Sequence, residues 1–208
     1  MTSVKSPFFF RWLSPQYLLC DLPSEERVIY LTFDDGPIPE ATPEILEILK
    51  KHDAKATFFV VGDNVRKHPD IFESVKQEGH AIGNHTFHHL NGWHSSPGLY
   101  MDDVYRCREY FETRLFRPPY GRFTPSQYFL LRKDFRFVLW SVLTHDFRRN
   151  TTPGQCLANA IEHSYGGAIV VFHDNLKSIG KVRYALPRFL DHFGALGFRF
   201  DGIGTNGK

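Results

Sequence analysis

The sequence predicts an α/β fold in which parallel strands alternate with helices in one domain. Seven short apolar runs alternate with amphipathic segments along the 208 residues, and no repeat, linker or low-complexity segment divides them. This alternation favours parallel strands joined by helical crossovers, which can form either an open sheet or a barrel. The length fits one domain with a sizeable core.

The elements of the N-terminal half follow from local composition. β-Branched and aromatic runs predict strands, and Thr-Pro before an apolar stripe at helical spacing predicts a capped helix. These rules predict a strand at 28–31 that closes on Thr32-Phe33-Asp34-Asp35-Gly36-Pro37, a helix capped at Thr42-Pro43, a strand at 56–61, a helix at 69–78 and a strand at 80–83.

The same rules divide the C-terminal half. Residues 1–27 are expected to form an irregular lead-in packed on the domain, which spans 28–208. The predicted elements are a helix at 96–115, a strand at 115–117, a helix from Thr124-Pro125, a strand at 137–142, a helix from Thr152-Pro153 to about Ser164, a strand at 168–172, a helix at 181–193 and a strand at 198–200.

Composition argues against several functional classes. The net charge of +2 arises from 25 basic and 23 acidic residues mixed along the chain, which gives no electrostatic basis for a nucleic-acid partner. Cys20, Cys107 and Cys156 lie far apart and are expected to be free buried thiols. The N-terminal apolar run is too short and interrupted for a signal peptide or membrane span, so a cytoplasmic location is expected if residue 1 is the native start, and export if the chain has been trimmed.

Polar residues suited to catalysis follow several of the predicted strands. In α/β folds with parallel strands, active residues gather at the carboxyl ends of the strands. The candidates therefore belong to one rim: Asp34 and Asp35 after the first strand, His85 and His89 after the third, Arg117 at the fourth, Asp146 after the fifth and His173 at the sixth.

The segment 83–89 offers imidazoles four residues apart. On a helical turn this spacing puts His85 and His89 on one face, within reach of a single ion. Two imidazoles and one carboxylate leave positions open for water and substrate, as in catalytic metal sites. These ligands suit Zn²⁺, with Fe²⁺, Co²⁺, Ni²⁺ and Mn²⁺ as alternatives.

Arg117 and His173 each admit a structural and a functional interpretation. Arg117 precedes a rigid Pro-Pro turn, where it can be solvated or can pair with a buried carboxylate. His173 ends a buried strand, where it can bond to a backbone carbonyl or act as a general acid tuned by Asp146.

Four motifs in order resemble the NodB-type polysaccharide deacetylase family (carbohydrate esterase family 4). They are TFDDGP at 32–37, HTFHH at 85–89, FRPPYG at 116–121 and the strand that ends in Val171-Phe172-His173, and the resemblance spans about residues 28–200. It implies a distorted (β/α) barrel of about seven parallel strands and hydrolytic removal of N-acetyl groups from amino-sugar glycans.

The resemblance also implies roles for individual residues. Asp34 would be the general base and Asp35 a metal ligand together with His85 and His89. Arg117 would orient Asp34, the backbone N–H of Tyr120 would stabilise the oxyanion, Val171 would line the acetyl pocket, and His173 would protonate the leaving amine beside Asp146. Trp140 and Phe147 are further substrate-binding candidates, although Leu143 and Phe147 replace an acid and a tryptophan that many members carry.

Several functions remain open at this point. The expected substrates are acetylated amino-sugar oligo- or polysaccharides of the peptidoglycan, chitin or poly-N-acetylglucosamine type. The same machinery could remove O-acetyl esters from xylan or hydrolyse a small amide, and a glycan-binding protein with an inactive site is the non-enzymatic alternative. Surface aromatics such as Trp93 and Tyr100 could contribute to glycan adhesion.

Overall fold

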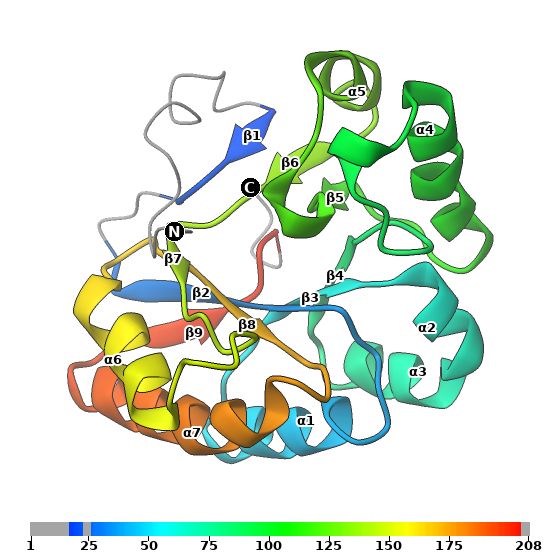
Figure 1. Cartoon of the computed structure of the whole chain (residues 1–208). Helices are drawn as coiled ribbons and strands as arrows, with labels where there is room; N and C mark the ends of the chain where they lie inside the picture. Colours follow the sequence, from blue (N-terminus) through cyan, green and yellow to red (C-terminus); the bar gives the residue numbers. More distant parts are fainter. Residues whose placement is uncertain (1–16, 23–25, 205–208) are drawn as a thin grey trace.

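The computed structural model describes residues 17–22 and 26–204. Within these residues nine strands form one sheet, flanked by seven α-helices (Figure 1). The strands are β1 (Leu18–Leu19), β2 (Val28–Asp34), β3 (Thr57–Val60), β4 (Ala81–Asn84), β5 (Leu115–Phe116), β6 (Arg136–Val138), β7 (Val142–Leu143), β8 (Ile169–His173) and β9 (Arg199–Asp201).

The helices cover the outside of this curled sheet. They are α1 (Thr42–Lys51), α2 (Gly62–Lys67), α3 (Pro69–Gln77), α4 (Pro97–Arg106), α5 (Pro125–Leu131), α6 (Pro153–His163) and α7 (Ile179–Ala195). Figure 1 shows α1, α6 and α7 side by side below β2 and β8, with α4 and α5 next to β5 and β6. The predicted α/β fold is therefore confirmed.

The strands pair in parallel and curl into a half-barrel. Their order is β1-β6-β5-β4-β3-β2-β8-β7, and β9 pairs with the first residues of β2. The chain from 136 to 143 supplies β6 on one side of the opening and β7 on the other. Between them, the Leu139 N–H donates to Leu19 O and the Ser141 N–H donates to Ile169 O, so this segment crosses the gap. The barrel is distorted, as the resemblance implied.

Alternate residues on each strand point to different environments, because successive side chains on a strand face opposite sides. On β2, Ile29, Leu31 and Phe33 pack in the apolar cluster that also contains side chains of α1, α6 and α7. Thr32 and Asp34 lie on the other face of β2, toward the interior of the half-barrel. The carboxyl ends of the strands thus bring polar side chains to one edge of the interior.

Helix capping agrees with the sequence at two of the three Thr-Pro positions. Thr124 and Thr152 form capping boxes with Gln127 and Gln155. Thr42 is not the N-cap of α1: the N-cap is Ala41, and the Thr42 hydroxyl instead donates to Asp174 and accepts from the backbone of residue 38.

One predicted helix ends early, one predicted strand is divided, and two elements, α2 and β1, were not predicted. The predicted helix at 96–115 ends at Arg106 with a 3₁₀ turn at Cys107–Glu109, because the following chain must reach the sheet: Thr113 Oγ1 donates to Ile82 O. The predicted strand at 137–142 is divided into β6 and β7 by the crossing of the gap. The short helix α2 was not predicted.

Part of the predicted lead-in belongs to the sheet. β1 pairs with β6, and the Leu22 N–H donates to Gly167 O. Residues 1–16 and 23–25 of that lead-in, and 205–208 of the predicted domain, lie outside the described residues. In the described part of the chain, no helix has the length and apolar character needed to cross a membrane.

Candidate active site

The loops at the carboxyl edge hold unusual backbone conformations. Among the described residues, six non-glycine residues have positive φ, and five of them lie in the loops that carry the candidate site residues. Such conformations cost free energy and cluster at functional sites, where the surrounding structure enforces them. The five are Asp35 (φ 91°), Thr86 (62°), His89 (56°), Tyr120 (61°) and His145 (60°).

Asp35, His85 and His89 converge on one point. One potential ligand atom from each residue lies within 4.8 Å of the other two. Oδ1 of Asp35 is 3.1 Å from Nε2 of His89 and 3.6 Å from Nε2 of His85. One carboxylate oxygen and two imidazole nitrogens form a donor set that suits a divalent transition metal.

The two histidines do not lie on a helical turn, so this part of the prediction is wrong. Residues 85–89 form an irregular loop after β4, and the positive φ of Thr86 and His89 turns the chain so that both imidazoles face Asp35. Asp103, which is buried, holds the loop by accepting hydrogen bonds from the backbone N–H groups of Phe87 and His88.

The protonation of these side chains also fits a metal. Nδ1–H of His85 donates to Arg117 O over 2.7 Å, which leaves the Nε2 lone pair for a ligand. Burial lowers the pKa of His85 to about 4, so the imidazole is neutral at pH 7. Burial raises the pKa of Asp35, but a hydrogen bond with His89 and the positive charge of His173 outweigh burial and hold this pKa well below its usual range.

Arg117 is fully buried and binds Asp34 directly. Its Nη1 donates to Oδ1 of Asp34 and to Oγ1 of Thr32, both over 2.7 Å. Nε and Nη2 donate to Val138 O and Leu139 O, and the guanidinium lies 4.1 Å from the ring centroid of Phe59. These hydrogen bonds orient the guanidinium, which in turn fixes the Asp34 carboxylate beside the candidate ligands Asp35 and His85.

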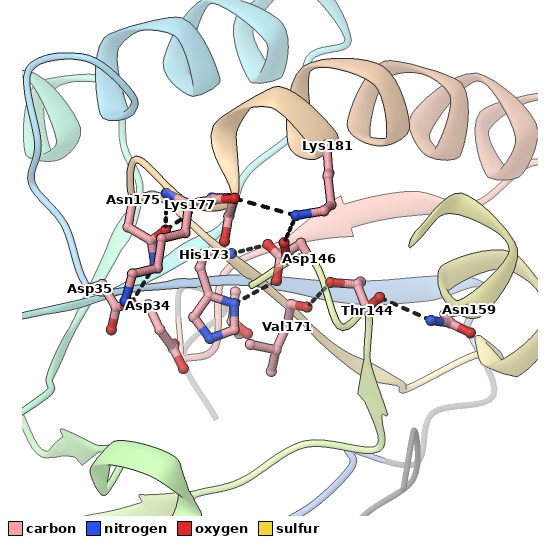
Figure 2. A network of polar contacts seen from close by, with 12 residues as sticks. Asp34, Asp35, Thr144, Asp146, Asn159, Val171, His173, Asn175, Lys177 and Lys181 are labelled. Carbon is pink, nitrogen blue, oxygen red and sulfur yellow. Dashed lines mark hydrogen bonds and ion pairs between the residues drawn. The ribbon is translucent and has the colours of Figure 1, made fainter. Parts of the chain in front are cut away.

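His173 and Asp146 form a second charged pair across the site (Figure 2). Nδ1 of His173 is 2.7 Å from Oδ1 of Asp146, whose Oδ2 accepts the backbone N–H of His173. Burial lowers the pKa of His173, but the charge of Asp146 and its hydrogen bond outweigh burial and raise it to about 10. The imidazolium is therefore the form present at neutral pH, with Nε2–H left to face the interior.

Helices α6 and α7 support this pair from outside the sheet. Nζ of Lys181 donates to Asp146 O over 2.7 Å, and Nδ2 of Asn159 donates to Thr144 O over 3.1 Å (Figure 2). The hydroxyl of Thr144 donates to Val171 O on β8. The segment that carries Asp146 is thus fixed to β8 and to two helices.

The predicted substrate-binding residues surround the same edge. The exposed ring of Tyr120 lies 4.9 Å from the ring of His89, and the ring of Phe147 lies 5.0 Å from that of His173. A Cβ on Gly121 would lie 2.7 Å from Trp140, which therefore packs against the turn that carries Tyr120. Val171 is fully buried on β8, on the same face as His173.

Comparison with known proteins assigns the family. A family model described as polysaccharide deacetylase matches residues 21–133. A peptidoglycan-N-acetylglucosamine deacetylase of Bacillus cereus is 34% identical over 193 residues, which cover 88% of this chain and 90% of that protein. The chain belongs to the polysaccharide deacetylase family.

Two further comparisons agree with this assignment. The solved structure of the Bc1960 peptidoglycan N-acetylglucosamine deacetylase superposes with a TM-score of 0.88, at 30% identity and 95% coverage of both chains. A peptidoglycan-N-acetylmuramic acid deacetylase of Bacillus subtilis is 35% identical over 72% of this chain and 61% of that protein. This polysaccharide deacetylase is thus an enzyme that hydrolyses N-acetyl amide bonds. Deacetylases of the family are metal-dependent, and Asp35, His85 and His89 form a candidate metal site here.

Two residues of the deacetylase site were missed by the sequence analysis. Nδ2 of Asn175 donates to Oδ2 of Asp35 over 2.6 Å, while its Oδ1 accepts the backbone N–H groups of Lys177 and Ser178 (Figure 2). The buried Asp174 accepts from the N–H of Gly36 over 2.8 Å and so holds the turn after Asp35. The available signal was the Asp-Asn pair directly after His173.

Proposed function

We propose that this deacetylase removes N-acetyl groups from amino-sugar glycans of the peptidoglycan type. The observation that carries the proposal is one carboxylate, Asp34, that stands beside the Asp35–His85–His89 cluster while a charged His173 faces it. This arrangement offers a base and an acid for one amide bond. The peptidoglycan specificities of the relatives support this choice of substrate.

Asp35, His85 and His89 would hold the metal, and Zn²⁺ is the ion that we propose. Neutral His85 and ionised Asp35 are in the protonation states that metal ligation requires. When bound, a divalent cation would supply Lewis-acid activation of a water molecule and of the acetyl carbonyl.

Asp34 would accept the proton of the attacking water. Arg117 binds Oδ1 of Asp34, and among the described residues no hydrogen bond reaches its Oδ2. Oδ2 is therefore the oxygen that takes the proton. Four hydrogen bonds hold the Arg117 guanidinium, so the base is fixed before substrate binds.

His173 would donate a proton to the departing amine from the opposite side. Amines leave poorly without protonation, so an acid must face the base across the amide carbon. Asp146 holds Nδ1 of His173, which leaves Nε2–H as the donor. The pKa of about 10 keeps this proton in place at neutral pH.

The backbone N–H of Tyr120 would stabilise the negative charge on the acetyl oxygen. Tyr120 has φ 61° in the turn at Pro119–Gly121, a conformation maintained by the contact of Gly121 with Trp140. Removing one oxyanion donor typically costs about 3–4 kcal/mol of transition-state stabilisation. Val171 and Phe147 would border the acetyl group.

The test is acetate release by the purified protein. The substrates are N-acetylglucosamine oligomers, a muramic-acid-containing oligosaccharide and acetylxylan, each assayed after chelation and after addition of Zn²⁺. Release from the amino sugars that stops on chelation and returns with metal supports the proposal. Release from acetylxylan alone would instead support the O-acetyl esterase alternative, and no release with fully loaded metal would support the glycan-binding alternative.

A further inference from the structure

The side chain of Arg122 stacks on the exposed ring of Trp93, near the candidate site in sequence. The side chain of Trp93 is 61% exposed, and the Arg122 guanidinium lies 4.8 Å from its ring centroid. Of the two aromatics considered for glycan adhesion, Trp93 is thus on the surface, whereas Tyr100 is fully buried in the core. An exposed indole offers an apolar face and a polar edge, a combination that is enriched at interfaces.

Both side chains of this pair are held by the segments beneath them. Nε1 of Trp93 donates to Phe123 O over 3.3 Å, which ties the indole to the segment that carries Arg122. The buried Gln127 donates to Gly92 O over 2.9 Å and so fixes the loop of Trp93 to α5. A Cβ on Gly92 would lie 2.5 Å from Arg122 O, so only glycine allows the two segments to approach this closely. The pair is therefore preorganised.

The pair lies close in sequence to two residues of the candidate site. Trp93 follows the ligand His89 by four residues, and Arg122 follows Tyr120 by two. The ring of Tyr120 packs on that of His89, with 4.9 Å between centroids. Two residues of chain span at most about 7 Å, so the Cα atom of Arg122 lies within about 7 Å of that of Tyr120.

The charge of Arg122 is available to a ligand. Among the described residues, no carboxylate forms an ion pair or hydrogen bond with Arg122; the same holds for the exposed Arg188, whereas Arg66, Arg183 and Arg199 each pair with an acid. A guanidinium binds a carboxylate through two parallel hydrogen bonds, and an indole face stacks on the apolar face of a sugar ring. Together they match a sugar that carries an acidic substituent.

We propose that Trp93 and Arg122 form a saccharide subsite for a carboxylate-bearing sugar, adjacent to the unit that is deacetylated. This inference rests on the proposed function and deepens it, because it assigns an acidic glycan as the preferred substrate. Trp93 would stack on neutral and acidic sugars alike. Arg122 would bind the carboxylate and so favour the acidic sugar.

The experiment compares two oligosaccharides of equal length. One contains only N-acetylglucosamine and is neutral; the other alternates N-acetylglucosamine with N-acetylmuramic acid and has free carboxylates. The variants are R122Q and W93A. R188Q is the matched control, because Arg188 lies 4.0 Å from the ring centroid of Tyr184 on α7, away from the site.

For R122Q we expect the ratio of KM for the acidic oligosaccharide to KM for the neutral one to rise about fivefold at low salt, because only the acidic substrate loses a charge partner. The difference should shrink as salt screens the charge. For W93A we expect KM to rise on the order of tenfold for both substrates. R188Q should behave as the unaltered protein. An equal effect of R122Q on both substrates, or no effect on either, would overturn the subsite.

Binding to metal-free protein separates this inference from the proposed function. Calorimetric titration with the acidic oligosaccharide measures the subsite without turnover. Weaker binding to R122Q than to the unaltered protein supports the subsite even if neither substrate is deacetylated, in which case the proposed function alone fails. Equal binding to both proteins refutes the subsite, whatever the activity.

Discussion

Arg117 donates a hydrogen bond of 2.7 Å to Asp34 in the interior of the half-barrel, where the guanidinium has no exposed surface. The same guanidinium donates to Thr32 and to two backbone carbonyls of the segment that crosses the gap. One side chain, directly after β5, thus connects the proposed base on β2 to β6 and to the segment that follows it. Because the pair is buried, losing either partner leaves an uncompensated charge in the interior.

The first prediction concerns stability. Replacing Arg117 with methionine should lower the free energy of unfolding by about 3–5 kcal/mol, because Asp34 and three oxygen acceptors lose their partner. Urea denaturation measures this. Arg188→Met is the control, since Arg188 is exposed and its loss should change stability by less than about 1 kcal/mol. Equal stability of the two variants would show that Arg117 is not a structural partner of Asp34.

The second prediction distinguishes the role of Asp34, the proposed general base, from that of the proposed metal ligands. Asp34→Asn should bind one metal equivalent and lose at least about 10³-fold in kcat, because the general base is gone while Asp35, His85 and His89 remain. His85→Ala should lose both metal and activity. The measurements are the metal content of both variants by atomic emission and their rates of acetate release. Full activity in Asp34→Asn would refute the base assignment.

The third prediction concerns pH. The raised pKa of His173 keeps the proposed acid protonated up to about pH 10, so kcat/KM should hold well into the alkaline range. Asp146→Asn removes the charge that opposes burial, so the pKa of His173 should fall and the alkaline limb should move to lower pH. Activity at pH 9 should then decrease more than activity at pH 6. A profile that drops uniformly, without a shifted limb, would contradict this role of Asp146.

The His173–Asp146 pair should also make the free energy of unfolding depend on pH. A histidine whose pKa is raised on folding stabilises the folded state fully below its unfolded pKa of about 6.5, and this contribution is lost as pH rises through about 10. The stability difference between the unaltered protein and Asp146→Asn should therefore shrink between these two pH values. Denaturation across that range tests the sign.

The fourth prediction concerns Asn175. Its Nδ2–H fixes Oδ2 of Asp35 and so presents Oδ1 to both histidines. Asn175→Ala should weaken metal binding about 10- to 100-fold, as is usual when a partner of a metal ligand is lost. Lys177→Ala is the neighbouring control and should bind metal normally. Competition with a fluorescent chelator measures both affinities, and identical values would remove Asn175 from the site.

The fifth prediction concerns metal removal. A ligand that binds only the folded state adds about 2.7 kcal/mol at a concentration 100 times its Kd. For a chain of this size that corresponds to roughly 5–11 °C in Tm. Thermal unfolding with Zn²⁺ and with chelator should show this difference in the unaltered protein and none in His85→Ala. A shift that persists in His85→Ala would place the ion elsewhere.

Much of the fold was predictable because its strands are apolar runs with clear ends. Runs such as 56–61 and 168–172 face apolar neighbours on both sides, and their composition alone identifies them. β1 was not predictable: two leucines carry no periodicity, and their pairing with β6 depends on residues more than a hundred positions away. The division of 137–142 has the same cause, since barrel closure imposes it.

The candidate site was predictable where a residue type itself implies chemistry. Two acids, two histidines and an arginine at strand ends indicated a common rim, and the structure brings them together. The local conformation was not predictable: spacing suggested a helical turn for His85 and His89, but Thr86 and His89 have positive φ in a loop whose backbone N–H groups donate to Asp103 on α4, which is distant in sequence. Asn175 was missed because an amide shows its role only through its partner.

β1 also covers a strand edge that would otherwise be open to pairing with another chain. Leu18–Leu19 covers the outer edge of β6, so that edge offers no free row of backbone donors and acceptors to another chain. If this short strand were cut away, β6 would become an open template for strand addition. Proteolytic loss of a segment far in sequence from the catalytic residues would then lead to aggregation.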